Sequence, residues 1–250
     1  MIQSPNYIHF RSQWQILGPD SPGQFSDRSR FQELMNILNK EPIALDFDDF
    51  TYRSDRCEMG KLRGNRPEGG AAFTKLTYSD KNLTLVEEWA DISAQEFKEK
   101  FVSVLTAWFQ IFPNTAIIAQ TCNLRALVQP VNFNDSRQFL GDNILQIGPH
   151  MRETFLHGMP FRVGFTFGCV HKLPDCQIFI DTAVNSWRDN RTVWVEVNGI
   201  SPMSQPINAT NTGKTEQAFE ACKCFLEDDV IKLLSKFDVV NDNEPKSGDS

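Results

Sequence analysis

The stretch Phe161-Arg-Val-Gly-Phe-Thr-Phe-Gly-Cys169 alternates large apolar residues with polar or small ones. Successive side chains of a β-strand point to opposite faces, so this alternation predicts a strand with one buried and one solvent-facing side. Two similar runs follow, over residues 176–184 and 193–197. Because only short polar links separate the three runs, we expect an antiparallel meander with one wet face.

Two other stretches repeat apolar residues every three or four positions, which is the spacing of an amphipathic helix. Ser93 and Glu96 form a capping-box pattern before the first stretch, and Pro113 ends it. The apolar positions are Phe97, Phe101, Leu105, Trp108 and Phe112 in the first, and Phe219, Cys222, Leu226, Val230, Leu233 and Phe237 in the second. A shorter helix is predicted from Phe31 to Leu38. We interpret these aromatic stripes as core packing rather than as a cofactor site.

The predicted elements occur twice in the same order. Strand, helix, three strands and helix span residues 6–112, and the same order with a short first helix spans residues 115–237. This predicts a single α+β domain over residues 1–237, built of two similar halves, in which two long helices cover one face of a mostly antiparallel sheet. The order is similar to that of the duplicated saddle of the TATA-binding protein, with one strand fewer in each half, and such a likeness does not imply function. Residues 238–250 are polar and acidic, and we expect a disordered tail there.

The chain has 250 residues, 40% hydrophobic and 23% charged, which is typical of a globular protein that buries a core without disulfides. Its formal net charge of −7 repels a phosphate backbone, so wholesale nucleic-acid binding is disfavoured, although a local basic patch could still provide it. No apolar run approaches the roughly 18 residues of a membrane span, and residues 1–10 do not resemble a secretory leader. We therefore expect a cytoplasmic protein that does not bind membranes and whose six cysteines remain reduced.

The Gly-Lys-Thr sequence at residues 213–215 stands where a phosphate-binding loop would place its lysine and hydroxyl. Asn208, however, occupies the position of a glycine that lets the backbone approach a phosphate closely. A helix N-cap by Thr212 or Asn211 is the simpler interpretation.

Asp46, Asp48 and Asp49 form an acidic cluster that could bind a metal ion. Asp46 and Asp48 would project from one face of a strand predicted over residues 43–50. The alternating apolar residues of this stretch equally indicate an ordinary half-buried strand.

Cys169, His171 and Cys176 could meet across a hairpin, but three ligands are too few for a closed structural zinc site. His9, on the polar face of the first predicted strand, and the other histidines stand singly, without a motif that supplies an orienting partner or a nucleophile. No complete catalytic or metal-binding motif is present in the sequence. We therefore interpret the chain as a protein that is not an enzyme and that uses no cofactor or metal.

The stretch from Arg53 to Gly70 is the least ordinary part of the sequence. Residues 53–66 of this stretch combine five cations with two acids, a local charge of +3: Arg53, Arg56, Lys61, Arg63 and Arg66 against Asp55 and Glu58. Its Gly and Pro content predicts a long hairpin loop. Such a loop could bind an acidic partner protein, contact phosphates or be a solvated tip.

Cys122-Asn-Leu-Arg-Ala-Leu-Val-Gln-Pro130 resembles the "Leu-Arg-Tyr" strand of a sporadically distributed family of uncharacterised bacterial proteins of similar size. Gln177-Ile-Phe-Ile-Asp-Thr-Ala183 resembles the apolar-Asp-apolar strand of that family, and the final helix with Phe219 lies at the corresponding place. The similarity covers mainly residues 94–237, and Ala126 replaces the usual tyrosine. It implies a cytosolic accessory protein of a type sometimes encoded beside defence systems such as CRISPR, and it supplies no catalytic residues.

We therefore expect a protein that acts by binding another protein in a bacterial defence or regulatory assembly. The five cations between residues 53 and 66 are the predicted partner-binding residues. The alternative is an accessory factor that contacts RNA or DNA through the same cations, with binding that weakens as salt rises. A small-molecule pocket between the sheet and the helices is a third interpretation.

Overall fold

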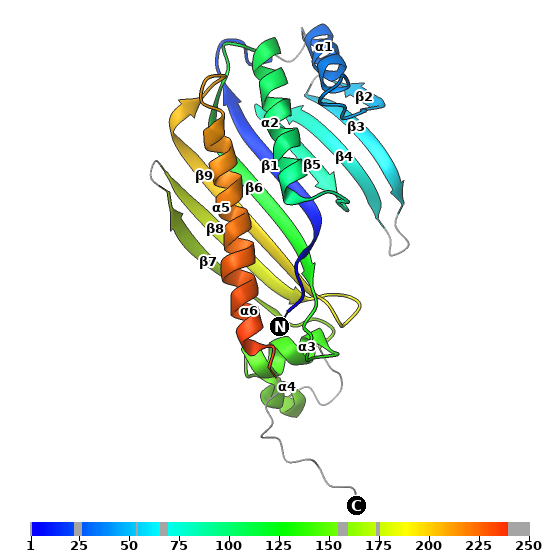
Figure 1. Ribbon diagram of the computed structural model, residues 1–250, viewed down its shortest axis with the longest axis vertical. Helices are drawn as coiled ribbons and strands as arrows, with labels where there is room; N and C mark the ends of the chain where they lie inside the picture. Colours follow the sequence, from blue (N-terminus) through cyan, green and yellow to red (C-terminus); the bar gives the residue numbers. More distant parts are fainter. Residues whose placement is uncertain are drawn as a thin grey trace, which may run out of the picture.

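The computed structural model describes residues 2–22, 27–53, 55–65, 70–154, 160–173 and 176–239. Within these residues, nine strands form one antiparallel sheet in the order β2-β3-β4-β5-β1-β6-β9-β8-β7 (Figure 1). The strands are β1 (Asn6–Leu17), β2 (Asp49–Tyr52), β3 (Arg56–Asn65), β4 (Ala71–Ser79), β5 (Asn82–Glu88), β6 (Ala116–Val128), β7 (Gly164–Lys172), β8 (Gln177–Ser186) and β9 (Val193–Ile207). The α+β class and the antiparallel sheet predicted from the sequence are confirmed.

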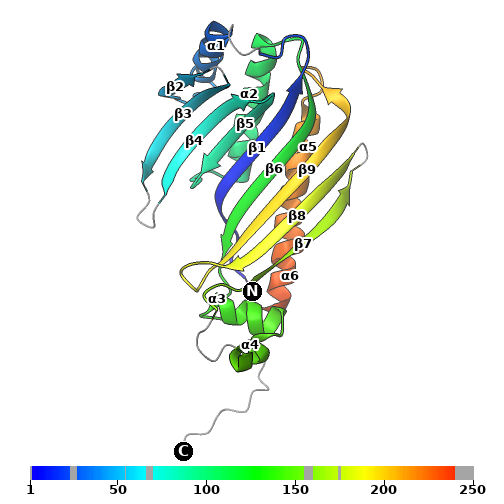
Figure 2. The ribbon, with the colours of Figure 1, turned by 180° about the vertical axis from the view of Figure 1, so that it is seen from behind.

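Three helical elements lie on one side of the sheet: α1, α2 and the long helix α5-η2-α6 (Figure 1). The helical segments are α1 (Arg28–Leu38), α2 (Ala94–Ile111), α3 (Ser136–Gln138), α4 (Gly148–Thr154), α5 (Gly213–Cys224) and α6 (Ile231–Phe237), with the π-helical turns η1 (Phe139–Ile144) and η2 (Phe225–Val230). Seen from behind, the strands lie in front of α2 and of the long helix (Figure 2). In the described ranges, no helix is both long and apolar enough to cross a membrane.

Strands β1 and β6 pair along most of their length at the centre of the sheet. We call β5-β4-β3-β2 on one side the first flank, and β9-β8-β7 on the other side the second flank. The meander predicted over residues 161–197 is confirmed from Gly164 onward as the second flank, where β7 pairs with β8 and β8 with β9 in antiparallel register. Phe161, predicted as the first apolar residue of its first strand, precedes β7 and is 88% exposed.

Helix α2 begins with the predicted capping box. The hydroxyl of Ser93 accepts a hydrogen bond from the backbone N–H of Glu96 at 3.2 Å, and the Glu96 carboxylate accepts one from the backbone N–H of Ser93 at 2.7 Å. These bonds satisfy two donors near the helix start, where backbone N–H groups have no partner within the helix. The box therefore sets where α2 begins, and so which of its residues face the sheet.

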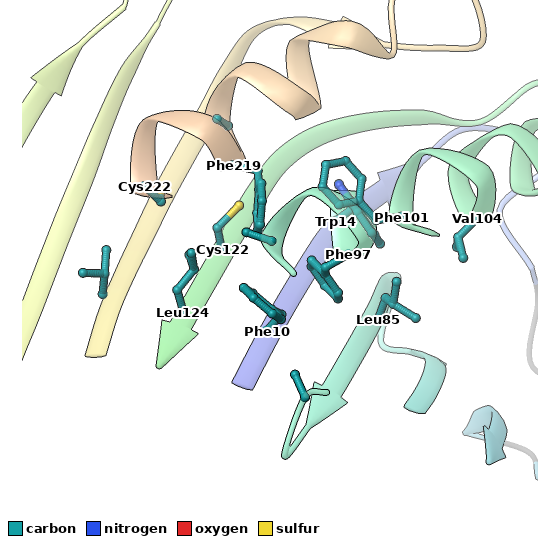
Figure 3. Packing of buried hydrophobic residues seen from close by; sticks show 14 of the residues in the cluster. Phe10, Trp14, Leu85, Phe97, Phe101, Val104, Cys122, Leu124, Phe219 and Cys222 are labelled. Carbon is teal, nitrogen blue, oxygen red and sulfur yellow. The ribbon is translucent and has the colours of Figure 1, made fainter. Parts of the chain in front are cut away.

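An aromatic cluster between β1, α2 and α5 joins the sheet to the helices (Figure 3). Phe10 of β1 stacks on Phe97 of α2 with ring centroids 5.1 Å apart, and Phe97 lies 5.6 Å from Phe219 of α5. The rings of Trp14 and Phe101 lie 5.8 Å apart. All five side chains are fully buried, and large buried aromatic rings supply much of the stabilisation of a core.

Helix α5 approaches the sheet closely at Gly199 of β9. A Cβ atom added at this position would lie 2.2 Å from Cys222 Sγ, which is closer than two nonbonded atoms can approach. The missing side chain at Gly199 therefore lets α5 pack directly on β9.

The stretch predicted as a long hairpin loop, residues 53–70, is mostly strand. Residues 56–65 form β3, which pairs with β2 and β4. Buried Cys57 and Met59 alternate with charged or small side chains, so the period of two is present but carries few apolar residues. Four strands therefore follow α1, where the sequence predicted three.

The prediction of a strand over residues 43–50 is wrong for its first part, residues 43–48. Strand β2 begins at Asp49, and Ala44 and Asp46 have φ angles of 44° and 53°. Left-handed backbone angles interrupt the regular alternation of a strand. Asp46 and Asp48 therefore do not project from one face of a strand.

Asp238, assigned to the tail from the sequence, belongs to the folded domain. Its carboxylate accepts hydrogen bonds from the backbone N–H groups of Val131 and Asn132 at 3.0 and 2.9 Å. These bonds attach the end of α6 to the segment after β6. Residues 240–250 of the predicted tail lie outside the described residues.

Candidate functional site

Figure 2 shows the face of the sheet that points away from α2 and α5, called here the open face. Polar side chains lie at its centre. The alternation of β1 places His9, Arg11 and Gln13 on this face, opposite the buried side chains that contact the helices. The strand register puts Glu88 of β5 and Arg125 of β6 directly beside His9. Four neighbouring strands, β5-β1-β6-β9, therefore contribute to one polar surface.

Two acid–base pairs occupy this centre. His9 Nδ1 lies 2.6 Å from Glu88 Oε2, and Arg125 Nε donates a hydrogen bond to Glu196 Oε1 at 2.7 Å. Asn123 Nδ2 donates to the same Glu196 oxygen at 2.8 Å. His9 and Arg125 thus each have a carboxylate partner on a neighbouring strand, which holds the side chains in place over the sheet.

A hollow of about 530 Å³ lies over these pairs. Its hydroxyl groups come from Thr77, Ser79 and Thr84. Within the described part of the chain, no hydroxyl is hydrogen-bonded to the ring of His9. A nucleophile activated by histidine makes such a bond. The described side chains that line the hollow offer polar contacts.

The charges of the open face balance. Strand register and alternation place five cations and five acids there, apart from His9: Arg11, Arg56, Lys75, Arg125 and Lys172 against Asp49, Glu58, Glu88, Asp181 and Glu196. Binding of a phosphate backbone relies on an excess of cations. The described open face has no such excess.

The second flank carries an exposed apolar row on the open face. Ile200 of β9 lies opposite Phe179 of β8, and Phe179 lies opposite Val170 of β7. These side chains are 42%, 48% and 51% exposed, respectively. Directly opposite residues on one face of a sheet have neighbouring side chains, so the three form one continuous patch, called here the apolar row.

Strand β7 is an edge strand beside the apolar row. It pairs with β8 through nine consecutive residue pairs without a register shift, and its other side pairs with no described strand. An edge of this kind offers unpaired backbone donors and acceptors to another chain.

The basic residues predicted from the sequence do not form one free surface. Arg56 lies 3.6 Å from Glu58, and Lys61 lies 3.1 Å from Asp46. Arg53 is exposed, in the link between β2 and β3. Arg66 lies outside the described residues.

Arg63, another of the predicted binding residues, contacts a buried carboxylate on the helix side of the sheet. Its NH2 group lies 2.9 Å from Glu87 Oε2, and the side chain of Glu87 is fully buried. Lys100 of α2 and Thr74 of β4 donate to the same carboxylate at 2.7 and 3.0 Å. The contacts join β3, β4, β5 and α2, which indicates a structural role for Arg63.

The Gly-Lys-Thr sequence begins α5, as expected, but the predicted caps differ from the observed ones. Thr212 makes no capping bond with its side chain. Thr215 donates its hydroxyl hydrogen to the carbonyl of Thr212 at 2.6 Å, and Asn211 Oδ1 accepts from the backbone N–H of Asn208 at 2.7 Å. Asn211 therefore stabilises the turn before α5 rather than the start of the helix itself.

Within the described residues, no three His, Cys, Asp or Glu side chains are grouped as metal ligands. Asp46 instead pairs with Lys61. Cys176 Sγ lies 3.6 Å from the hydroxyl of Ser201, and Cys169 and His171 lie on the helix side of β7. The acidic cluster and the cysteine–histidine hairpin therefore retain no geometric support as metal sites.

Comparisons with known proteins find no matching protein-family model and no similar curated protein.

Sequence reasoning identified the polar side of β1 but missed the surface around it. Glu88 and Glu196 are far from His9 and Arg125 in sequence, and only strand pairing brings them together. A signal for Phe179 was present, because this residue is apolar on the face of β8 that its own alternation predicts to be wet.

Proposed function

We propose that this chain is a non-catalytic interaction protein that binds another protein on the open face of the second flank. The apolar row carries the proposal, because Val170, Phe179 and Ile200 are neighbours in register and each is about half exposed. Contiguous exposed apolar patches with a polar rim often mark protein-binding surfaces, whereas isolated exposed apolar residues need no explanation.

The surroundings of the apolar row fit a protein interface. Asp181 and Lys172 lie on the same face, so the apolar centre has charged neighbours of both signs. Interfaces between proteins typically combine an apolar centre with a polar rim. The free edge of β7 could add backbone hydrogen bonds to an extended segment of the partner.

The two motifs that resemble the bacterial family both reach the open face. Arg125 belongs to the first motif and pairs with Glu196, and Asp181 belongs to the second. This supports the open face as the functional surface. The assignment to a bacterial defence or regulatory assembly in the cytoplasm rests on the resemblance of residues 94–237 alone and is part of the proposal.

The nucleic-acid alternative has weaker support. Arg56, Lys61 and Arg63 each lie near an acid, and Arg63 contacts a fully buried one. The open face also carries balanced charge, so its attraction for a phosphate backbone is weak. A crosslinking experiment distinguishes nucleic-acid binding from protein binding.

The test is photo-crosslinking in nuclease-treated extract of the native host, with a photoreactive amino acid in place of Phe179. The matched control carries the same amino acid in place of Leu62, which is 62% exposed on β3 of the first flank. We expect a defined protein adduct from position 179 and none from position 62. Phe179→Asp should abolish co-purification of the same protein, whereas Leu62→Asp should not.

Identical adducts from both positions would contradict the proposal, because they would report random collision. Recovery of bound material only from a parallel extract without nuclease, lost in Arg53→Glu and retained in Phe179→Asp, would favour the nucleic-acid alternative. Thermal unfolding of Phe179→Asp and Leu62→Asp should stay close to that of the wild type, because these side chains are 48% and 62% exposed.

A further inference from the structure

A second hollow, of about 650 Å³, lies on the first flank where β2 turns into β3. Three aromatic rings and three cations are among its lining residues: Phe31, Tyr52, Tyr78, Arg53, Arg56 and Lys81. It is far in the sheet order from the apolar row, since the first and second flanks lie on opposite sides of β1 and β6. The hollow is therefore a separate site from the surface proposed to bind a protein partner.

The aromatic rings form a floor that is continuous with the core. Phe31 of α1 lies 5.9 Å from Tyr52 and 5.7 Å from Tyr78, measured between ring centroids. Tyr78 also lies 5.2 Å from buried Trp108 of α2. Burial, with a smaller effect of Asp27, raises the pKa of Tyr78 to about 12, so its hydroxyl stays neutral near pH 7. The floor is thus an uncharged, preformed surface of the kind on which a planar ring packs.

Two tight links hold the cations at the rim. The backbone N–H of Arg53 donates to the carbonyl of Arg56 at 2.8 Å, which closes the link between β2 and β3. Lys81 lies in the turn between β4 and β5, and its carbonyl accepts a hydrogen bond from the backbone N–H of Ile16 at 2.7 Å. The backbones that carry Arg53 and Lys81 are therefore fixed before any ligand arrives.

Two of the cations at the rim are able to bind an anion. Among the described residues, Arg53 and Lys81 form no ion pair, whereas Arg56 Nη1 lies 3.6 Å from Glu58 Oε1. Two acids, Asp55 and Asp80, also line the hollow. The lining thus keeps an excess of one positive charge.

We propose that this hollow binds a small molecule in which a phosphate or carboxylate group is attached to a planar ring. The ring packs against Tyr52, and the anionic group is held by the guanidinium group of Arg53 and the ammonium group of Lys81. Guanidinium groups bind the oxygens of carboxylates and phosphates through paired, charge-assisted hydrogen bonds. Site volumes of a few hundred Å³ with an apolar lining and few polar groups are typical of small-molecule sites.

The test is isothermal titration calorimetry of the full chain with three probes: adenosine monophosphate, indole-3-carboxylate and inorganic phosphate. We expect at least one of the two ring-bearing anions to bind more tightly than inorganic phosphate. Arg53→Gln should weaken that binding by about tenfold or more, as the loss of a charge-assisted bond implies. Tyr52→Leu should weaken the ring-bearing anion but leave inorganic phosphate unchanged.

The matched control is Arg11→Gln, which removes an exposed cation from the open face and should leave the affinity unchanged. Arg53 is exposed as well, so its variant should keep the fold, as thermal unfolding would verify. Tighter binding of the nucleotide would identify a phosphate ligand, and tighter binding of the indole acid a carboxylate. No heat from either ring-bearing anion at about 1 mM, or equal weakening by Arg11→Gln, would overturn the proposal.

Discussion

The two flanks of the sheet bury their helix-facing sides in different ways. The first flank places the carboxylate of Glu87 beneath α2, in contact with Arg63 and Lys100. The second flank places aliphatic side chains, such as Ile178 and Val195, at the corresponding depth. The first flank therefore depends on a compensated buried charge, and the second on apolar packing.

On the open face the contrast is reversed. The first flank pairs Lys75 with Glu58 at 3.0 Å, while the second flank exposes Phe179 and its neighbours in the apolar row. Most of the described charges of the basic stretch are engaged within the fold, whereas an unremarkable alternating strand carries the best candidate binding surface. The difference shows that a run of like charge in a sequence need not be a free surface, because its partners can come from distant strands.

The largest effect is expected where both flanks share one core. Phe97→Ala should lower the free energy of unfolding by about 4 kcal/mol, since it removes a fully buried ring between β1 and α5. Urea denaturation measures the change, and Phe161→Ala, at a position 88% exposed, is the control with an expected effect below about 0.5 kcal/mol. Hydrogen exchange that speeds up in one flank only would show that the flanks do not share this core.

Removing the buried charge should damage the first flank. Glu87→Gln should cost about 3 kcal/mol, because it leaves Arg63 and Lys100 without their carboxylate at a fully buried position. The control is Glu88→Gln on the open face, where the side chain is 25% exposed and the expected cost is below about 1 kcal/mol. Equal costs for the two variants, measured by urea denaturation, would mean that the buried cluster adds nothing beyond a surface ion pair.

The helices over the two flanks also differ at their starts. Ser93→Ala should cost about 1 kcal/mol, because it removes the cap of α2, whereas Thr212→Ala at α5 should cost less than about 0.3 kcal/mol, because Thr212 makes no side-chain capping bond. Hydrogen bonds from the backbone and side chain of Ser93 hold the pKa of Glu96 below its usual range. The Glu96 carboxylate therefore stabilises the folded state fully at pH values above the pKa of the unfolded carboxyl group. This stabilisation is lost as pH falls through the lower pKa of the folded state.

We consequently expect the wild type to lose more stability than Ser93→Ala between pH 7 and pH 3. Thermal unfolding across this range checks the sign. A larger acid loss in the variant than in the wild type would contradict the capping role of Glu96.

The smallest effect on stability is expected at the apolar row. Val170→Thr should change the free energy of unfolding by less than about 0.5 kcal/mol, because the side chain is half exposed. The same change at fully buried Val195 should cost about 2 kcal/mol, since it buries a hydroxyl group. A loss of partner crosslinking in Val170→Thr at unchanged stability would sharpen the contrast between the flanks, and a large loss of stability would assign the row to the core.

Local patterns predicted a large part of the fold. The capping box at Ser93 and the meander of the second flank depend on residues within one helical turn or one strand, and both are confirmed. Strand β3 was missed because only two of its helix-facing residues, Cys57 and Met59, are apolar, which weakens the usual alternation of apolar and polar residues. The irregular segment before Asp49 was predicted as a strand because Ala44 and Asp46 have positive φ angles that cannot be recognised from their residue types.

The candidate site was less accessible to prediction than the fold. The polar side of β1 follows from its alternation, but the pairing of His9 with Glu88 joins residues 79 positions apart. The alternation of side chains along β8 predicts that Phe179 is exposed. Its contact with Ile200, in contrast, requires the register between β8 and β9.

The sequence by itself determined the α+β class, the start of α2 and the inward and outward positions of the second flank, because helix caps and side-chain alternation act between near neighbours. The tertiary structure decided which charges are paired and which apolar side chains stay exposed. Arg63 meets Glu87, and Val170 meets Phe179, only through the register of strands that the chain connects by turns. Register depends on the geometry of the turns and on the packing of the sheet against its helices, so residue types along one strand cannot specify it.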